Sequence, residues 1–125
     1  MLSIEKLIEK QCKSEEKTIV IHIDQLGDDV KIRVPFMEEF KELLEKHKDN
    51  QANVKFDLVY QNMIEPKLND DKLLTHFNCK DKPYLVVERI FGGAISDNIS
   101  ALILDEREKD NTVKIVNDKI DAVKN

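Results

Sequence analysis

The stretch that decides the fold runs from Leu58 to Ile103 and reads LVYQNMIEPKLNDDKLLTHFNCKDKPYLVVERIFGGAISDNISALI. Short apolar clusters at helical spacing are separated there by Pro66, by residues 69–71 (NDD), by residues 81–83 (DKP) and by Gly92-Gly93. Such residues are typical stop and start signals of helices. The stretch therefore predicts a small helical bundle made of capped pieces, and none of these pieces contains a catalytic constellation.

The composition of the whole chain predicts one domain, residues 1–125, that binds no nucleic acid. With 125 residues, 41% of them hydrophobic, a chain of this length removes roughly two-thirds of its extended surface from water. The net charge is -5, and the only arginines are Arg33, Arg89 and Arg107. Nucleic-acid-binding proteins concentrate Arg on a basic face, because neutralising phosphates supplies much of their affinity.

The amino terminus and the cysteines predict a cytoplasmic protein. MLSIEKLIEK mixes charges into its apolar positions, unlike a signal peptide, and no segment approaches the ~20 apolar residues of a membrane span. Cys12 and Cys79 are the only cysteines, so no disulfide framework is indicated and both are expected to be free thiols.

Upstream of the bundle, the pattern predicts a short helix and a β-hairpin. Residues 1–17 form an amphipathic helix, with Ile4, Leu7, Ile8 and Gln11 on one face, and a polar connector. Residues 18–34 form the hairpin, because a β-branched run and an alternating run flank Gly27, which suits a tight reversal.

The two predicted strands differ in their faces. The second, residues 30–34 (VKIRV), alternates between apolar and basic residues, so one face is expected to be buried (the dry face) and the other exposed to solvent. The first, residues 18–24 (TIVIHID), is apolar on both faces except for His22, and is expected to lie centrally or under a helix. A lone hairpin is only marginally stable, so its apolar residues need helical cover or a second copy of the chain; dimerisation through the hairpin edge is the second option.

Downstream of the hairpin, five further helices are expected. Pro35 opens the first, and the second spans residues 52–64. A short helix capped by Asn69 or Asp70 follows, then one that begins after Asp81 and stops at Gly92-Gly93, and then a longer one that ends in a solvated charge run at residues 105–110. The expected inner faces include Val54, Leu58, Val59 and Met63 in the second helix and Ile95, Ile99, Leu102 and Ile103 in the long helix. The fold class is α+β, mostly α: an N-terminal hairpin, as a small antiparallel sheet, packed on a helical bundle of residues 35–104.

A last helix is predicted over the C-terminal residues 105–125. Asn111 caps it, and Val113, Val116, Ile120 and Val123 recur at 3-4-3 spacing. These residues would form a narrow apolar stripe, here called a seam, on one side of the helix, with charged residues on the opposite side. Such a seam either completes the bundle or pairs with a helix of another protein, and the same two interpretations hold for Ile4, Leu7 and Ile8 at the amino terminus.

The residues with metal-binding or nucleophilic chemistry are few and dispersed. His76 and Cys79 have the spacing of half a zinc site, but Cys12, His22 and His47 supply no second pair, and tetrahedral zinc needs four ligands. Cys79 with His76 as its base lacks an evident oxyanion donor. We therefore expect no metal, no organic cofactor and no enzymatic activity.

Two other polar features have structural explanations. The acidic pairs Asp28-Asp29 and Asp70-Asp71 are better explained as turn and cap residues than as Mg²⁺ ligands. Gly92-Gly93 lacks the GxxxxGK context of a phosphate-binding loop and is typical of a helix end.

Two segments carry a resemblance to a known family. They are residues 20–40, VIHIDQLGDDVKIRVPFMEEF, and residues 60–91, YQNMIEPKLNDDKLLTHFNCKDKPYLVVERIF. The pattern resembles the XkdN-like tail assembly chaperones of contractile-tailed phages and PBSX-like defective prophages over most of residues 18–104. The residues that match best are Leu26-Gly27, then Pro66, Leu68, Asn69 and Asp70, and then Cys79, Asp81, Pro83, Val86 and Val87. The amino-terminal helix is shorter than the polar leader expected in that family, and residues 105–125 fall outside the match.

The resemblance implies a non-enzymatic viral protein of the host cytoplasm. Such chaperones hold the tape measure protein until the tube polymerises, and they are absent from the finished tail; the resemblance implies tail tube subunits as a second client. Two other classes stay open, a structural tail or baseplate subunit and a small regulatory protein-binding module. The residues expected to bind a partner are those of the two terminal seams: Ile4, Leu7, Ile8, Val113, Val116, Ile120 and Val123.

Overall fold

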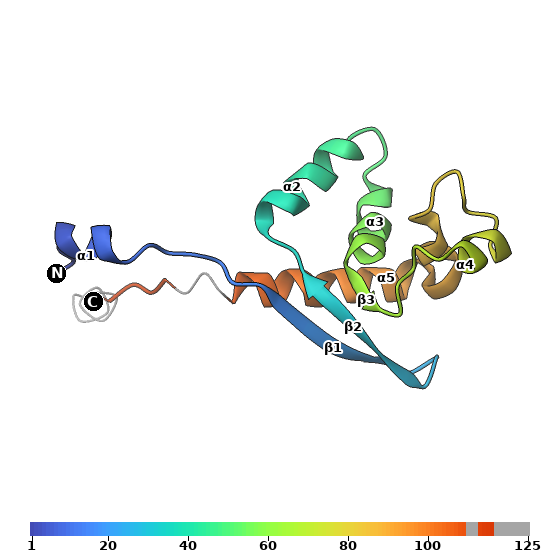
Figure 1. The fold of residues 1–125 in the computed structure, drawn as a ribbon, viewed down its shortest axis with the longest axis horizontal. Coiled ribbons are helices and arrows are strands. Elements are labelled where there is room, and N and C mark those ends of the chain that lie inside the picture. The colour runs from blue at the N-terminus through green and yellow to red at the C-terminus, as the bar shows by residue number, and fades with distance from the viewer. Residues whose placement is uncertain (110–112, 117–125) are drawn as a thin grey trace, which may run out of the picture.

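The computed structural model describes residues 1–109 and 113–116. Figure 1 shows a three-stranded antiparallel sheet and helices of an α+β fold that is mostly α. In chain order the elements are α1 (Ile4–Glu9), β1 (Lys17–Ile23), β2 (Asp28–Val34), α2 (Met37–Lys46), α3 (Ala52–Asn62), β3 (Met63–Glu65), α4 (Asp71–His76) and α5 (Leu85–Glu108). The predicted fold class, a small antiparallel sheet on a helical bundle, is confirmed.

The hairpin forms where the alternation predicts it. Gly27 has φ +63°, a left-handed conformation that glycine adopts without steric cost. The register pairs Ile19 with Ile32 and Ile21 with Val30, so these side chains share one face of the sheet. On β2 the predicted dry face is buried, since Val30, Ile32 and Val34 all belong to the core.

Of the two alternatives predicted for the first strand, a central position or cover by a helix, the central position is wrong. The strand order is β1-β2-β3, which makes β2 the central strand and β1 an edge strand. On one face of β1, Ile19 and Ile21 are partly buried against the core, but Val20 on the other face is 64% exposed. The sequence predicted a two-stranded or slightly larger sheet from residues 18–34 alone. The third strand, β3, comes from outside that range and pairs with β2 through Met63 and Ile32.

The helix predicted over residues 52–64 ends two residues early. α3 stops at Asn62, and Met63 and Ile64 enter β3 instead. The expected inner residues of this helix are nevertheless buried: Val54, Leu58, Val59 and Met63. The local pattern could not separate the two structures, because the pairing of Met63 with β2 is a long-range contact.

The capping signals place the remaining helices. The carboxylate of Asp70 accepts a hydrogen bond from the backbone N–H of Leu73 at 3.0 Å, which starts α4. In α5 the predicted break is present, since Gly92 has φ 75° and ψ 177°. The chain is helical again after this residue, and the two helical segments are described together as α5.

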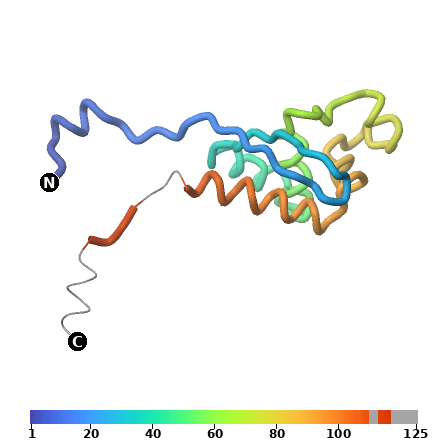
Figure 2. Tube along the Cα trace, turned by 90° about the horizontal axis from the view of Figure 1, so that it is seen from below, coloured from blue at the N-terminus to red at the C-terminus, as the bar shows by residue number. Residues whose placement is uncertain are grey.

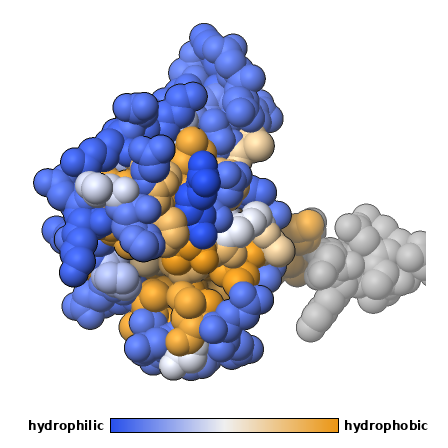
Figure 3. All heavy atoms as spheres, turned by 90° about the vertical axis from the view of Figure 1, so that its right-hand side faces the viewer, coloured by the Kyte–Doolittle hydropathy of each residue, from blue (hydrophilic) through white to orange (hydrophobic). Residues whose placement is uncertain are grey.

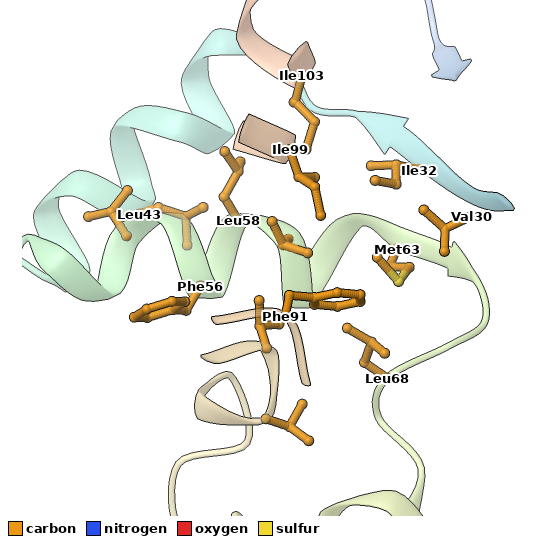
Figure 4. Close-up of a cluster of buried hydrophobic side chains, with 14 of the residues drawn as sticks. Val30, Ile32, Leu43, Phe56, Leu58, Met63, Leu68, Phe91, Ile99 and Ile103 are labelled. Atoms are coloured by element: carbon orange, nitrogen blue, oxygen red, sulfur yellow. The ribbon is translucent and has the colours of Figure 1, made fainter. Parts of the chain in front are cut away.

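The core lies between the sheet and helices α3 and α5. Figure 4 shows side chains from β2, α2, α3, β3 and α5 gathered in one cluster. Ile32, Val59 and Ile103 are completely buried. Two predictions for α5 are wrong: Leu102 is 47% exposed, whereas Arg107, expected in a solvated charge run, is 2% exposed. Asp110, the last residue of that run, lies outside the described residues.

Candidate functional site

Both terminal segments of the described chain leave the body at the same end. Figure 1 shows the segment before β1 and the end of α5 side by side there. The ammonium group of Lys17 donates a hydrogen bond to the carbonyl oxygen of Glu106 at 3.1 Å. Nη1 of Arg107 donates to the carbonyl oxygen of Glu15 at 3.1 Å. These bonds fix the point from which each segment departs.

Arg107 is the centre of this anchor. Its Nε donates to the Pro35 carbonyl oxygen at 2.9 Å and its Nη2 to the Val34 carbonyl oxygen at 2.6 Å. The guanidinium carbon lies 4.7 Å from the centroid of the Phe36 ring. A planar guanidinium offers five donors in a fixed fork, so one side chain can hold the ends of β2 and α5 and the amino-terminal segment together.

Arg33 holds the same amino-terminal segment from the outer face of β2. Its guanidinium donates to both carboxylate oxygens of Glu16, at 3.1 and 3.2 Å, and to both of Glu39, at 2.7 and 2.9 Å. Bidentate pairs of this kind are the strong form of ion pair. The hydrogen bond with Arg33 lowers the pKa of Glu39, and those with Glu39 and Glu16 raise the pKa of Arg33.

Beyond these anchors the amino-terminal segment has no packing partner in the described chain. No residue of α1 is buried, and Ile4, Leu7 and Ile8 are all exposed. Figure 2 shows α1 at a distance from the body. The hydroxyl of Ser3 accepts from the N–H of Lys6 at 3.2 Å and caps the helix. An isolated helix of six residues is unstable in water, so α1 needs a partner surface.

The carboxyl-terminal segment is also exposed, but it is not the predicted helix. Val113 and Val116 are each 91% exposed, and residues 113–116 have no helical structure. The predicted helix is therefore wrong for these residues. Asn111, Ile120 and Val123, which complete the predicted cap and seam, lie outside the described residues. Of the seven expected partner-binding residues, five are thus described, and all five are exposed.

A buried carboxylate links α2 to α3. Asp57 accepts hydrogen bonds from the Lys46 ammonium at 2.8 Å, His47 Nε2 at 2.7 Å and Gln61 Nε2 at 2.9 Å. Desolvation by burial, the largest single influence, raises the pKa of Asp57, but the three hydrogen bonds outweigh it and hold this pKa below its ordinary value. Every partner lies on α2, at its end or on α3, so the cluster fastens these helices.

The residues weighed as metal ligands or as a nucleophile lie in separate environments. Cys79 is buried, and its thiol donates to the Phe77 carbonyl oxygen at 3.3 Å. The His76 ring contacts the ring of Phe77, with centroids 4.7 Å apart. His22 is exposed and bonds to Asp29 at 2.7 Å, whereas His47 belongs to the Asp57 cluster. In the part of the chain that the structure describes, no three His, Cys, Asp or Glu side chains are grouped so as to hold a metal ion.

Sequence reasoning missed the two anchoring arginines. A signal for them was present, because Arg33 and Arg107 are two of only three arginines in a lysine-rich chain. Arg is preferred over Lys where bidentate or multiple hydrogen bonds must be made away from water. Two of the three arginines therefore occupy fixed positions, whereas the third, Arg89, is exposed.

Comparisons of the chain with protein-family models, curated proteins and solved structures give no match. None of the helices within the described residues is long and apolar enough to cross a membrane. The anchored, exposed terminal segments are therefore the features from which a function has to be argued.

Proposed function

We propose that this protein is a non-enzymatic tail assembly chaperone of a phage or prophage, which binds the tape measure protein, and also tail tube subunits, in the host cytoplasm. The observation that carries the proposal is the pair of exposed apolar segments at one end of a well-packed body. The resemblance of residues 18–104 to XkdN-like chaperones supplies the identity of the client.

The amino-terminal segment fits a client that is itself a long helix. Ile4, Leu7 and Ile8 form one apolar stripe on α1, and Glu5, Lys6, Glu9 and Lys10 surround it. A stripe of this kind packs against the apolar stripe of a partner helix. Residues 10–16, between α1 and β1, have no helix or strand and give α1 reach.

The affinity expected from this stripe is low, as a chaperone requires. Burying three such side chains contributes about 5–9 kcal/mol as an upper estimate. Association costs about 4–15 kcal/mol in lost translational and rotational freedom. The surplus is small, so tail tube subunits would displace the chaperone when the tube polymerises around the tape measure protein.

The test is co-expression with a tape measure protein of a contractile-tailed phage, followed by a pull-down. Leu7→Asp places a charge in the α1 stripe and should abolish capture. Lys6→Asp introduces the same side chain on the polar side of α1 and should leave capture intact. Equal capture by both variants would refute the assignment of α1 as the client-binding helix.

The same system separates the alternative classes. A chaperone is absent from purified tails, whereas a structural tail or baseplate subunit remains in them at fixed stoichiometry. A small regulatory module would capture neither the tape measure protein nor the tube subunits. Mass spectrometry of purified particles, together with the pull-down, therefore distinguishes all three.

A further inference from the structure

The two edges of the sheet are built differently. β3 forms one edge with only three residues, its pairing with β2 is interrupted by a register shift, and Pro66 follows it directly. Short edge strands, bulges and prolines are devices that keep an edge from pairing with another chain. β1 forms the other edge with seven residues in continuous register with β2, and residues 18–23 (TIVIHI) contain no lysine or proline. The β1 edge therefore lacks the protection that the β3 edge has.

An apolar hollow lies beside the β1 edge. It has a volume of about 260 Å³, and its apolar lining comes from two residues of β1 and three of α5: Ile21, Ile23, Ile95, Ile99 and Leu102. None of the described residues that line it belongs to β2, so the hollow opens on the side of β1 that has no strand beside it in the described chain. Figure 3 shows hydrophobic residues gathered at the hairpin end of the molecule within a rim of hydrophilic ones. A strand added here would find backbone partners and apolar contacts in the same place.

The inner face of β1 is complementary to itself. Ile19, Ile21 and Ile23 alternate along the strand and share the face that packs toward the core. When two copies of β1 pair antiparallel about a two-fold axis at Ile21, Ile19 of one copy lies opposite Ile23 of the other, and Ile21 lies opposite itself. An axis normal to the sheet keeps the inner faces of both copies on the same side. One contact then forms three apolar cross-strand pairs beside the two hollows.

The charges along the strand select this register. With the axis at Ile21, Thr18 lies opposite Asp24, and no two like charges face each other across residues 17–25. An axis at Val20 would instead place Glu16 opposite Asp24 in two symmetry-related pairs of like charge, which destabilise a sheet. A shift by one residue would set the apolar face of one copy against the outer face of the other.

We propose that this protein forms a homodimer in which the β1 edges of two copies pair antiparallel about Ile21 and join their two sheets into one. The occupant of the β1 edge is thus a second copy of the chain. Each copy contributes the same edge and the same hollow, as an interface with two-fold symmetry requires. The interface uses neither terminal segment, so it does not depend on the proposed client.

Light scattering and sedimentation equilibrium on the full chain test the dimer. We expect a monomer–dimer equilibrium with a Kd below about 100 μM. Thr18→Asp places a second carboxylate opposite Asp24, whose side chain is 99% exposed, in both symmetry-related pairs. This variant should raise the Kd by about 2- to 30-fold. Within one copy the new carboxylate lies opposite Arg33 on β2, so the fold of the monomer should be kept.

Two further variants give responses of the opposite sign. Thr18→Lys faces Asp24 of the second copy with an opposite charge and should lower the Kd. The double variant Thr18→Asp with Asp24→Lys converts both like-charge pairs into opposite-charge pairs and should restore the Kd of the original chain or lower it further. Far-UV circular dichroism at low concentration checks that each variant is folded.

Three results would overturn the proposal. The first is a chain that is still monomeric at about 100 μM. The second is a Kd that stays the same in all three variants, which would place the dimer contact away from β1. The third is a tighter dimer in Thr18→Asp, because the new carboxylate would then lie opposite His22 and the axis would be at Val20.

Discussion

Replacement of Arg107 by Ala should loosen the join between β2, α5 and the amino-terminal segment. The substitution removes three hydrogen bonds from a charged donor and leaves the carbonyl groups of Val34, Pro35 and Glu15 without that donor. A hydrogen bond to a charged group contributes about 1.5–3 kcal/mol, so loss of the two buried bonds, to Val34 and Pro35, alone costs about 3–6 kcal/mol. A domain of this size has about 5–15 kcal/mol of stability in total, so the loss should be severe.

Urea unfolding measures this loss, and α5 itself offers the control. With a slope of about 1.5 kcal/mol per molar urea, the midpoint should fall by roughly 2–4 M. Arg89→Ala removes an exposed arginine from the same helix and should change the free energy of unfolding by less than about 0.5 kcal/mol. Arg107→Lys should be intermediate, because an ammonium group lacks the planar fork. A midpoint for Arg107→Ala within the range of the Arg89→Ala control would refute the anchoring role.

Three further predictions follow from single sites. The pKa of Asp57 is lower in the folded chain than its ordinary value of 3.8, so its ionised carboxylate stabilises the fold above that pH, and this stabilisation is lost as the pH falls through the lowered value. Urea midpoints measured between pH 6 and pH 2 should show this loss. In Asp57→Asn this part of the pH dependence should be absent. Gly92→Ala should lower the free energy of unfolding by about 1–3 kcal/mol, because φ 75° with ψ 177° is a glycine conformation. Gly93→Ala should raise it by about 0.5–1 kcal/mol, because Gly93 has helical backbone and an added Cβ would meet only Lys55 Nζ, at 3.8 Å. Thermal unfolding of both variants measures the two changes. Leu7→Asp should leave the melting temperature unchanged, since α1 packs on nothing in the described body.

The parts of the fold that local sequence determines were predictable. Alternation in VKIRV gave the buried face of β2, Gly27 gave the turn, and Asp70 gave the start of α4. Each of these features depends on residues a few positions apart. What the sequence could not provide was the order of strands, because alternation tells which face of a strand is buried and not which strands lie beside it. The edge position of β1 and the change from helix to strand at Met63 both depend on pairing with the distant β2.

The burial of Arg107 was missed for a different reason, because the helical spacing already indicated it. Ile99, Ile103 and Arg107 recur every four residues and therefore lie on one face of α5. Leu102 lies beside that stripe, which explains its exposure. Grouping residues 105–110 by charge hid this periodicity, since a buried arginine among acidic neighbours looks like part of a solvated run. Ile4, Leu7 and Ile8, in contrast, were named as partner residues from their helical spacing. Their exposure is what a binding surface requires, and their binding of a partner stays a prediction.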